Sequence, residues 1–443
     1  MQEAHHAQGG DRLEIYEIHG GVPLKGSVSI SGSKNGALAL MAGALLINGE
    51  VLLHNVPRIE DVETMMALLA DLGVRFEWQG NSLWMETRSL SHASPNPERV
   101  NRMRASFYIF GPLLARLGYA NMPHPGGCQI GARPVNFHIR GLRELGATIE
   151  ESESLYRATA SRLKGARIYL DMPSAGATQQ LMTAAVLADG LTIIENAAME
   201  PEVVNLANFL NAAGARIEGA GTSTIYIEGV TGLKPYVEFS VIPDRLEAGT
   251  FVLAGAITRG DITLEHIIPE HLHALFAKLR ESGVEIEESE DSARIRARDP
   301  LQGVDIRTMP YPGFPTDLQQ PMCAYLTMAQ GASKVLETIY ENRTQHVPEL
   351  RKMGADIVAE GRTIFINGVK QLRGATVRAT DLRGGAALVV AALAATGTTR
   401  IQEISHIDRG YENLEAKLQS LGAQIQRVYP YAVATPLGEA SEA

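Results

Sequence analysis

ALALMAGALLING, residues 37–49, is an apolar, alanine-rich segment that ends at a glycine. A helix that is apolar on nearly every side has no face suited to water, so it is buried among other elements. Five further segments of this kind follow along the chain and end at glycines: 105–118, 177–190, 248–260, 318–331 and 384–397. The terminal glycines lie 69, 72, 70, 71 and 66 residues apart. The segment is therefore one copy of a feature that occurs six times.

A second marker repeats with the same period. Each apolar segment is followed by a short strand-like run and then by a helix with apolar residues three and four apart, the pattern of a surface helix. These helices end at Gly73, Gly146, Gly214, Gly283, Gly354 and Gly422, which are spaced by 73, 68, 69, 71 and 68 residues. Two independent markers with a period near 70 indicate one structural unit copied along the chain.

Each unit is predicted to run as strand, buried helix, strand, amphipathic helix and further strands, so the fold class is α/β. The glycines at the helix ends predict C-caps. Six buried helices need shared cores. Two groups of three, with helices inside and sheets outside, meet that need.

Composition narrows the function. The chain has 443 residues, 45% of them hydrophobic, which predicts two domains. A net charge of −10 disfavours a nucleic-acid partner, although local arginines can still bind a small anion. Two distant cysteines and a polar start without an apolar signal segment predict a reduced, cytoplasmic protein. The apolar runs reach about a dozen residues, short of the ~20 that a membrane span needs, so we expect no membrane association.

Polar residues gather just before each buried helix. They are Lys34-Asn35, Arg104, Ser174 with Gly176, Asp244-Arg245, Asp317 and Asp381-Leu382-Arg383. Helices with a common orientation would bring these six N-termini to one cleft, where free N–H groups and helix dipoles attract anions. Three of the residues suit N-capping: Ser174, Asp317 and Asp381. Cations oppose the dipole at an N-terminus, so Lys34, Arg104 and Arg383 indicate a bound anion.

PHPGGCQIGARPVN, residues 123–136, has three glycines and three prolines and predicts an irregular loop. It contains Cys128 and Arg133. A nearby guanidinium favours the reactive thiolate over the thiol. The alternative is a surface loop that holds a cysteine by chance.

PGGCQIGARPVNFH, residues 125–138, resembles the catalytic loop of the enolpyruvyl transferases that act on UDP-N-acetylglucosamine, and the likeness runs from about residue 14 to about residue 428. The resemblance implies a two-lobed inside-out α/β barrel, with three repeats in each lobe. One lobe would be residues 34–241, and the other residues 1–33 with 242–443. The active site would lie in the cleft between them.

The same resemblance implies the reaction. The enolpyruvyl group of phosphoenolpyruvate would pass to the 3-hydroxyl of UDP-N-acetylglucosamine with release of phosphate, the first committed step of peptidoglycan precursor synthesis. Addition would give a tetrahedral ketal, and elimination would follow. The resemblance implies two small-molecule substrates, no cofactor, no metal, and sensitivity of Cys128 to fosfomycin. The oligomeric state is left open.

Residue roles also follow from the resemblance. Phosphoenolpyruvate would be held by Lys34, Arg133, Arg383 and Arg409, and the sugar nucleotide by Asn35 and Arg104. Asp317 would be the general base, while Cys128 could act as an acid, form a covalent adduct or assist elimination. Ile339, Arg343 and Asp381 match further substrate-site positions. The nucleotide would lie near Arg133, Pro134, Val135, Asn136 and Phe137 and near Ser174, Ala175 and Gly176.

Asn136 departs from the family pattern, which usually has Asp there. Asn keeps an acceptor and loses the charge. A transferase acting on another nucleotide or nucleotide sugar is therefore an open alternative, as is a non-catalytic paralogue. The shikimate 3-phosphate branch lacks the PGGC…RP loop. Acidic charge and six repeats disfavour an RNA-terminal phosphate cyclase.

Several other residues are predicted to be structural. Cys323 lies inside an apolar helix and should pack in the core. His138, His346 and His406 begin similar helices and are better explained by capping or packing than by metal binding. No spacing resembles a metal site, and no glycine pattern fits a Rossmann or P-loop fingerprint.

Overall fold

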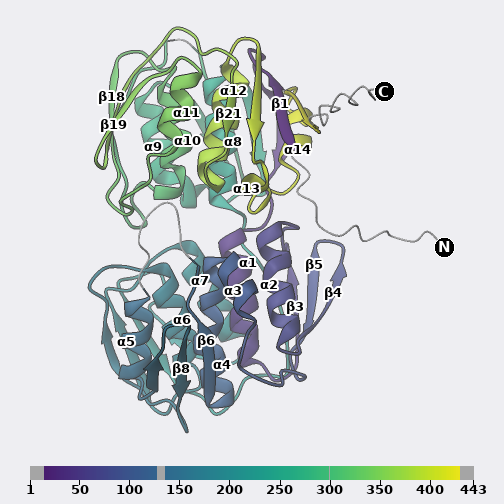
Figure 1. The fold of residues 1–443 in the computed structure, drawn as a ribbon, viewed down its shortest axis with the longest axis vertical. Helices are drawn as coiled ribbons and strands as arrows, with labels where there is room; N and C mark the ends of the chain where they lie inside the picture. Colours follow the sequence, from purple (N-terminus) through teal and green to yellow (C-terminus); the bar gives the residue numbers. More distant parts are fainter. Residues whose placement is uncertain (1–13, 127–134, 299, 430–443) are drawn as a thin grey trace, which may run out of the picture.

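The structure, a computed structural model, describes residues 14–126, 135–298 and 300–429. Figure 1 shows two compact groups of helices and strands, called here the first and the second mass, which are stacked along the long axis of the molecule. Six separate sheets are present in the described residues, five with four strands and one with three. The α/β class is therefore confirmed.

The first mass contains three sheets. Their strand orders are β13-β3-β5-β4, β6-β8-β7 and β11-β12-β10-β9. The strands are β3 (Glu50–His54), β4 (Arg75–Gln79), β5 (Ser82–Glu86), β6 (Tyr119–Pro123), β7 (Thr148–Glu151), β8 (Leu155–Thr159), β9 (Arg167–Tyr169), β10 (Leu191–Glu195), β11 (Arg216–Glu218), β12 (Thr224–Glu228) and β13 (Tyr236–Ser240).

The second mass contains the other three sheets. Their orders are β21-β22-β1-β23, β15-β16-β14-β2 and β17-β18-β20-β19. The strands are β1 (Ile15–His19), β2 (Lys25–Ser29), β14 (Asp261–Glu265), β15 (Glu285–Glu288), β16 (Ser292–Arg296), β17 (Ile306–Arg307), β18 (Ala332–Leu336), β19 (Asp356–Glu360), β20 (Thr363–Asn367), β21 (Thr376–Arg378), β22 (Thr398–Gln402) and β23 (Gln424–Val428).

Each predicted apolar segment forms a buried helix. These are α1 (Lys34–Gly43), α4 (Phe110–Leu117), α6 (Ala175–Ala185), α8 (Arg245–Ile257), α10 (Gln319–Leu326) and α12 (Leu382–Ala394). In the second mass α8, α10 and α12 all contact one another. In the first, α4 contacts α6, and the 3₁₀ helix η2 (Arg104–Ile109) contacts both α1 and α6. Shared burial of these apolar helices is the main source of stability.

Two buried helices start later than predicted. The second apolar segment begins with η2 before α4, and in the fifth η4 (Thr316–Leu318) comes first, so that α10 starts one residue after Leu318. Pro112 and Pro321 are each the third residue of the α-helix that follows. Proline has no N–H to bond the carbonyl four residues back, and its ring clashes with that carbonyl. An α-helix therefore cannot extend through the preceding turn.

The amphipathic helices are the second element of each repeat. They are α2 (Glu60–Asp71), α5 (Asn136–Glu144), α7 (Pro201–Ala212), α9 (His273–Glu281), α11 (His346–Lys352) and α14 (Leu414–Ser420). The glycine that follows each helix end has a positive φ, from 88° to 102°. The predicted C-caps are confirmed there. Among the buried helices only α4 ends at its predicted glycine, Gly118, which is its C-cap. The other five α-helices end several residues before the glycine of their segment, so the C-caps predicted there are wrong.

Two hydrophobic clusters correspond to the two masses. The first core gathers residues between Ala37 and Val241, and the second core combines Tyr16–Ile30 with Leu246–Ile425. Strand β2 pairs in parallel with β14, and β13 pairs in parallel with β3, so the chain crosses between the cores after β2 and after β13. Gly32 and Pro243 form a β-bridge where these crossovers meet. We propose that the cores are two lobes, with the boundary at residues 34–241.

Four short helices complete the described chain: η1 (Ala44–Leu46), α3 (Pro97–Arg102), η3 (Pro269–Leu272) and α13 (Ser405–Asp408). None of the helices in the described ranges has both the length and the apolar character needed to cross a membrane.

Candidate active site

Asp317 lies between two arginines of the second core. Arg343 Nη1 is 2.8 Å from Asp317 Oδ1, and Arg383 Nε is 3.5 Å from Oδ2. The N-cap expected at Asp317 is wrong, because the N-cap of η4 is Pro315, that of α10 is Leu318, and neither helix has a side-chain cap. Asp317 therefore faces cations, with 27% of its side chain exposed.

Arg383 is one of the largest fully buried side chains of the described residues. Its Nη1 donates to the Tyr411 hydroxyl at 3.0 Å, and that hydroxyl lies 2.8 Å from Thr250 Oγ1 on α8. Burial lowers the pKa of Arg383, but Tyr411 and the carboxylates Asp317 and Asp244 raise it more, so it lies above its ordinary value. The arginine stays charged in a dry setting.

Asp381 caps α12. Its Oδ1 accepts the backbone N–H groups of Arg383 and Gly384, both at 3.0 Å, and its Oδ2 accepts from Gln320 Nε2 at 3.0 Å. Ser174 caps α6 through a 3.3 Å bond from the Ala177 N–H. Both predicted N-caps are confirmed. The capping by Asp381 also fixes the start of the helix that carries Arg383.

Glu337 was not found by sequence reasoning. It is 1% exposed and follows β18, where it accepts the backbone N–H of Ile339 at 2.8 Å and the hydroxyls of Thr308 and Thr316, both at 2.9 Å. These bonds hold the loop that carries Ile339 and Arg343 against the turn that carries Asp317. Arg343 itself is 3% exposed and also donates to Thr316.

A second carboxylate, Asp61 on α2, lies between Lys34 and Arg409. Lys34 Nζ is 3.1 Å from Asp61 Oδ2, and Arg409 Nε is 2.9 Å from Oδ1. Lys34 and Asp61 belong to the first core, whereas Arg409 follows α13 in the second. This ion pair therefore joins the two cores. Asp61, too, was not found from the sequence.

The two charged groups are neighbours. The Lys34 backbone N–H donates to Asp244 Oδ2 at 2.9 Å, so the starts of α1 and α8 meet. A Cβ at Gly410 would come 2.8 Å from Leu382 Cδ2 and 3.2 Å from Lys34 Cδ, so the backbone beside Arg409 packs on the starts of α12 and α1. With the Gln320–Asp381 bond, four of the six predicted N-termini converge: those of α1, α8, α10 and α12.

The other two N-termini meet on the first core. A Cβ at Gly176, in the first turn of α6, would come 3.1 Å from Tyr108 Cε1 in η2, so only glycine packs there without a shift. Arg104 at the start of η2 lines a cavity with Val135, Asn136 and two further arginines, Arg140 and Arg143. Phe137 lies beneath the Arg140 guanidinium, 5.4 Å from ring centroid to Cζ.

For some of the predicted site residues the structure shows only their burial, or does not describe them. Asn35 and Ala175 are partly buried first-turn residues of α1 and α6. Cys128, Arg133 and Pro134 lie outside the described residues, so their predicted roles are not tested.

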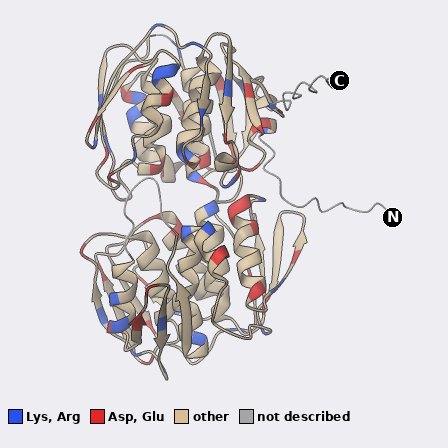
Figure 2. Cartoon of the chain, viewed as in Figure 1, with Lys and Arg blue, Asp and Glu red and all other residues tan. Residues whose placement is uncertain are grey.

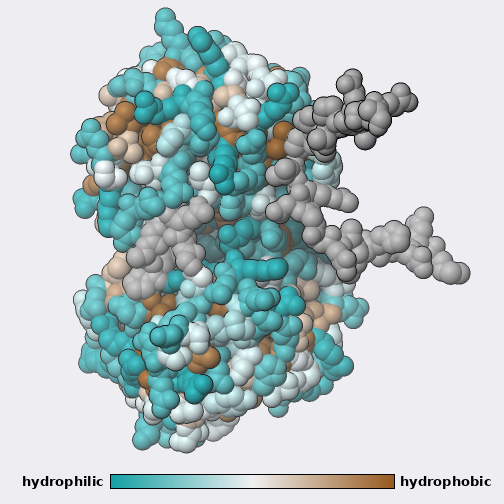
Figure 3. Space-filling view, in the orientation of Figure 1, coloured by the Kyte–Doolittle hydropathy of each residue, from teal (hydrophilic) through white to brown (hydrophobic). Residues whose placement is uncertain are grey.

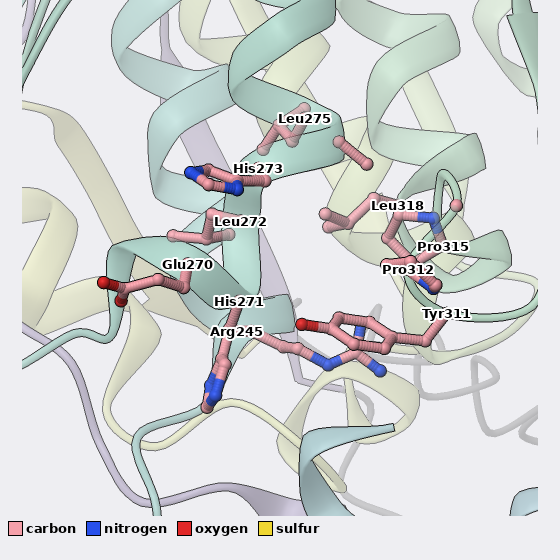
Figure 4. A pocket seen from close by; sticks show the side chains of 12 residues that line it. Arg245, Glu270, His271, Leu272, His273, Leu275, Tyr311, Pro312, Pro315 and Leu318 are labelled. Carbon is pink, nitrogen blue, oxygen red and sulfur yellow. The ribbon is translucent and has the colours of Figure 1, made fainter. Parts of the chain in front are cut away.

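A further ion pair between the cores involves Glu202 of α7 and Arg245 of α8. Arg245 Nε and Nη2 lie 3.1 and 3.3 Å from the two carboxylate oxygens of Glu202, which is 4% exposed. Figure 4 shows the Arg245 side chain beside the Tyr311 ring at the edge of a small pocket. The guanidinium carbon is 5.6 Å from that ring's centroid. This pair lies next to the crossover and helps to fix how the cores meet.

Charge and polarity gather where the two masses meet. Figure 2 shows Lys, Arg, Asp and Glu residues close together at this level. Figure 3 shows the surface recessed there, with mostly hydrophilic residues visible beside the grey atoms. The described residues contain no group of three or more His, Cys, Asp or Glu side chains that could hold a metal ion.

Three of the four residues predicted to be structural are buried, and the fourth, His406, is partly exposed. Cys323 is 0% exposed, and burial raises the pKa of its thiol. His138 contacts Gln180 and is 9% exposed, and His346 is 0% exposed. His406 is 31% exposed and lies 3.8 Å from Glu403.

His346 should make stability depend on pH. Burial lowers its pKa from 6.5 to about 4, so the folded state keeps it neutral while the unfolded chain binds a proton below 6.5. The stability that the neutral His346 ring contributes to the folded state is present above pH 6.5 and is lost as the pH falls towards 4. Because of His346, the free energy of unfolding should be about 2 kcal/mol lower at pH 5 than at pH 7.

The measurement is urea unfolding of the wild type and of His346→Gln at pH 7 and pH 5. The variant should lose about 2 kcal/mol less than the wild type between the two pH values. Equal losses would contradict the neutral, buried state of His346. His406→Gln is the matched control, since that ring is partly exposed.

Comparison with known proteins agrees with this architecture. The sequence model of the EPSP synthase family, 3-phosphoshikimate 1-carboxyvinyltransferase, matches residues 18–418. The solved enolpyruvyl transferase NikO from Streptomyces tendae superposes with a TM-score of 0.86 at 25% identity, covering 95% of this chain and 100% of that one. EPSP synthase from Acinetobacter baumannii superposes with a TM-score of 0.74 at 19% identity, over 94% of this chain and 100% of that one. The fold and the paired cations define a transferase of the enolpyruvyl transferase class.

Curated relatives narrow the class. A UDP-N-acetylglucosamine 1-carboxyvinyltransferase from Nostoc sp. is 54% identical over 419 residues, 94% of either chain. One from Carboxydothermus hydrogenoformans is 52% identical over 418 residues, 94% of this chain and 100% of the relative. The chain belongs to the family of UDP-N-acetylglucosamine 1-carboxyvinyltransferases.

Proposed function

We infer that this chain transfers the enolpyruvyl group of phosphoenolpyruvate to the 3-hydroxyl of UDP-N-acetylglucosamine and releases phosphate, in the synthesis of peptidoglycan precursors. The observation that carries the inference is that four cations gather at neighbouring helix starts, Lys34 and Arg409 around Asp61, and Arg343 and Arg383 around Asp317. Such a group of cations suits a small substrate with a phosphate and a carboxylate. Curated relatives at 54% and 52% identity carry this activity in their names.

The proposed chemistry begins with the acceptor hydroxyl. Asp317 takes its proton as the oxygen attacks C2 of phosphoenolpyruvate, and C3 receives a proton, which gives the tetrahedral ketal. Loss of a proton from C3 and departure of phosphate from C2 then restore the double bond in the product. A carboxylate is a weak base for an alcohol, so Asp317 must act through position. Its ion pairs with Arg343 and Arg383 supply that position.

The cations have a separate task. Lys34 and Arg409 would hold phosphoenolpyruvate from the two cores, with Arg383 beneath. Planar guanidinium groups bind phosphate and carboxylate in a bidentate manner. Cys128 and Arg133, outside the described residues, keep the roles that the family pattern implies. The cytoplasmic location is part of this proposal and rests on the two distant cysteines.

The test is phosphate release from phosphoenolpyruvate with and without UDP-N-acetylglucosamine, before and after fosfomycin. Release that needs the sugar nucleotide and stops with the drug supports both the substrates and Cys128. Absence of release with this acceptor contradicts the proposed substrate.

Asn136 gives a reason to test a second acceptor class. It is the first residue of α5 and lines the cavity beside Arg104. An amide lacks the charge of the usual carboxylate, so a panel of other nucleotides and nucleotide sugars should follow in the same assay. Turnover only with another acceptor would favour a different enolpyruvyl transferase. Failure with every acceptor would favour a non-catalytic paralogue.

A further inference from the structure

Both carboxylate oxygens of Asp61 bind a cation, and burial keeps the side chain away from a substrate. It is the second residue of α2, is 2% exposed, and gives one carboxylate oxygen to Lys34 and the other to Arg409. A buried carboxylate is costly unless it is paired, and this one is paired twice. Two cations with candidate roles in phosphate binding are thus held by one side chain that lies behind them.

Lys34 and Arg409 keep donors that Asp61 does not use. An ammonium has three N–H donors and a guanidinium has five. Within the described ranges, Asp61 takes one donor from Lys34 and only the Nε donor from Arg409, and neither Nη of Arg409 has a hydrogen-bond partner. The Arg409 side chain is 35% exposed, whereas that of Asp61 is 4% exposed. The fork of Arg409 is therefore available on the open side of the pair.

Each of the two groups pairs two cations with one carboxylate. Lys34 and Arg409 with Asp61 carry a net charge of about +1, as do Arg343 and Arg383 with Asp317. The two groups differ in exposure, since 27% of the Asp317 side chain is accessible against 4% for Asp61. Asp317 can reach a substrate, and Asp61 can act only through the cations that it holds.

We propose that Asp61 is a positioning residue for phosphoenolpyruvate, which aligns Lys34 of the first core and Arg409 of the second so that their remaining donors converge on one anion. The inference rests on the proposed function and assigns to that site a residue outside the set predicted from the sequence. It also makes the Asp61–Arg409 pair a contact through which binding of the anion depends on the relative position of the cores.

The test is Asp61→Asn, which keeps the shape, removes the charge and turns an N–H group towards one of the cations. We expect the KM for phosphoenolpyruvate to rise at least about 10-fold, because the aligned cations lose their common partner. The Kd for UDP-N-acetylglucosamine, measured by calorimetry without phosphoenolpyruvate, should change less than about twofold. Asp61→Glu, which keeps the charge, should recover part of the lost affinity.

Asp71→Asn is the matched control. Asp71 ends the same helix and pairs with the partly exposed Arg99 at 2.6 Å, far along α2 from the cations. It should leave both substrates unaffected. Equal loss for both substrates in Asp61→Asn would show a general structural role and overturn the inference. An unchanged KM for phosphoenolpyruvate would overturn it as well.

Direct binding separates this inference from the proposed reaction. Phosphoenolpyruvate and inorganic phosphate are titrated into the wild type and Asp61→Asn by calorimetry, without any turnover. A wild type that binds these anions but releases no phosphate contradicts the reaction alone. Equal affinity of the two proteins for both anions contradicts the positioning role. Failure of the wild type to bind either anion contradicts both.

Discussion

Asp317→Asn is expected to lower kcat by at least about 10³-fold while the protein still binds UDP-N-acetylglucosamine. Two losses combine in this variant. The amide cannot accept the proton of the 3-hydroxyl, which removes general-base help worth about 10²–10⁴-fold. It also leaves Arg343 and Arg383 without the carboxylate that lies 2.8 and 3.5 Å from them. The arginines then lose the orientation that the reaction needs.

The measurement is steady-state phosphate release together with calorimetry of the sugar nucleotide. A kcat loss with a change in Kd below about fivefold separates a chemical role from lost binding. Asp356→Asn is a suitable control, since Asp356 is exposed and only bonds Asn367 at 3.0 Å. Asp317→Asn with more than a tenth of the wild-type kcat would exclude Asp317 as the base.

The repeat could be predicted because it depends on local rules. An apolar helix must be buried, and a helix that stops before a turn favours glycine in the left-handed region, as at Gly73 and Gly422. The 3₁₀ turns before α4 and α10 were also within reach, since Pro112 and Pro321 lie three residues into those helices. Once the turn before α10 is 3₁₀, Asp317 no longer caps a helix.

Asp61 could not be selected from the sequence. The first turn of α2 holds Glu60, Asp61 and Glu63, and acidic residues are common there because they favour the helix dipole. Only the packing of α2 beside α1 and the contact with Arg409 distinguish Asp61, which is buried, from Glu63, which faces solvent. Its partner Arg409 is 348 positions away in the chain. Long-range pairing of this kind is set by how the two cores meet, and no local pattern encodes it.

Glu337 was missed for a related reason. It follows β18, whose residues alternate between exposed and buried, and a charged residue just after such a strand suggests a loop that faces solvent. In the structure it is buried because backbone N–H groups and two threonine hydroxyls satisfy both oxygens. A carboxylate that accepts hydrogen bonds from loop N–H groups and hydroxyls can be buried at low cost, because its own oxygens are also satisfied. These bonds hold the loop in place.

Arg383→Met is expected to affect stability and activity together. The side chain is 2% exposed, and it donates to Tyr411 and faces Asp317. Removing one partner from a buried charged group typically costs about 3–5 kcal/mol, and the partial exposure of Asp317 lowers this to about 2–3 kcal/mol. The kcat/KM for phosphoenolpyruvate should fall at least about 10³-fold, since a cation that we propose to bind the anion is lost.

Arg383→Lys separates the two effects. A lysine keeps the positive charge near Asp317 but cannot donate to Tyr411 and to an anion from one planar fork. It should therefore regain at least half of the unfolding free energy lost in the methionine variant, yet less than about a tenth of the lost kcat/KM. Urea unfolding and phosphate release measure the two quantities on the same protein. Full activity in Arg383→Lys would mean that Arg383 supplies charge alone. An unchanged free energy of unfolding in Arg383→Met would mean that the Arg383–Asp317 contact contributes nothing to the stability of the fold. The expected split between the two measurements follows only if the guanidinium serves the core through its charge and the substrate through its geometry.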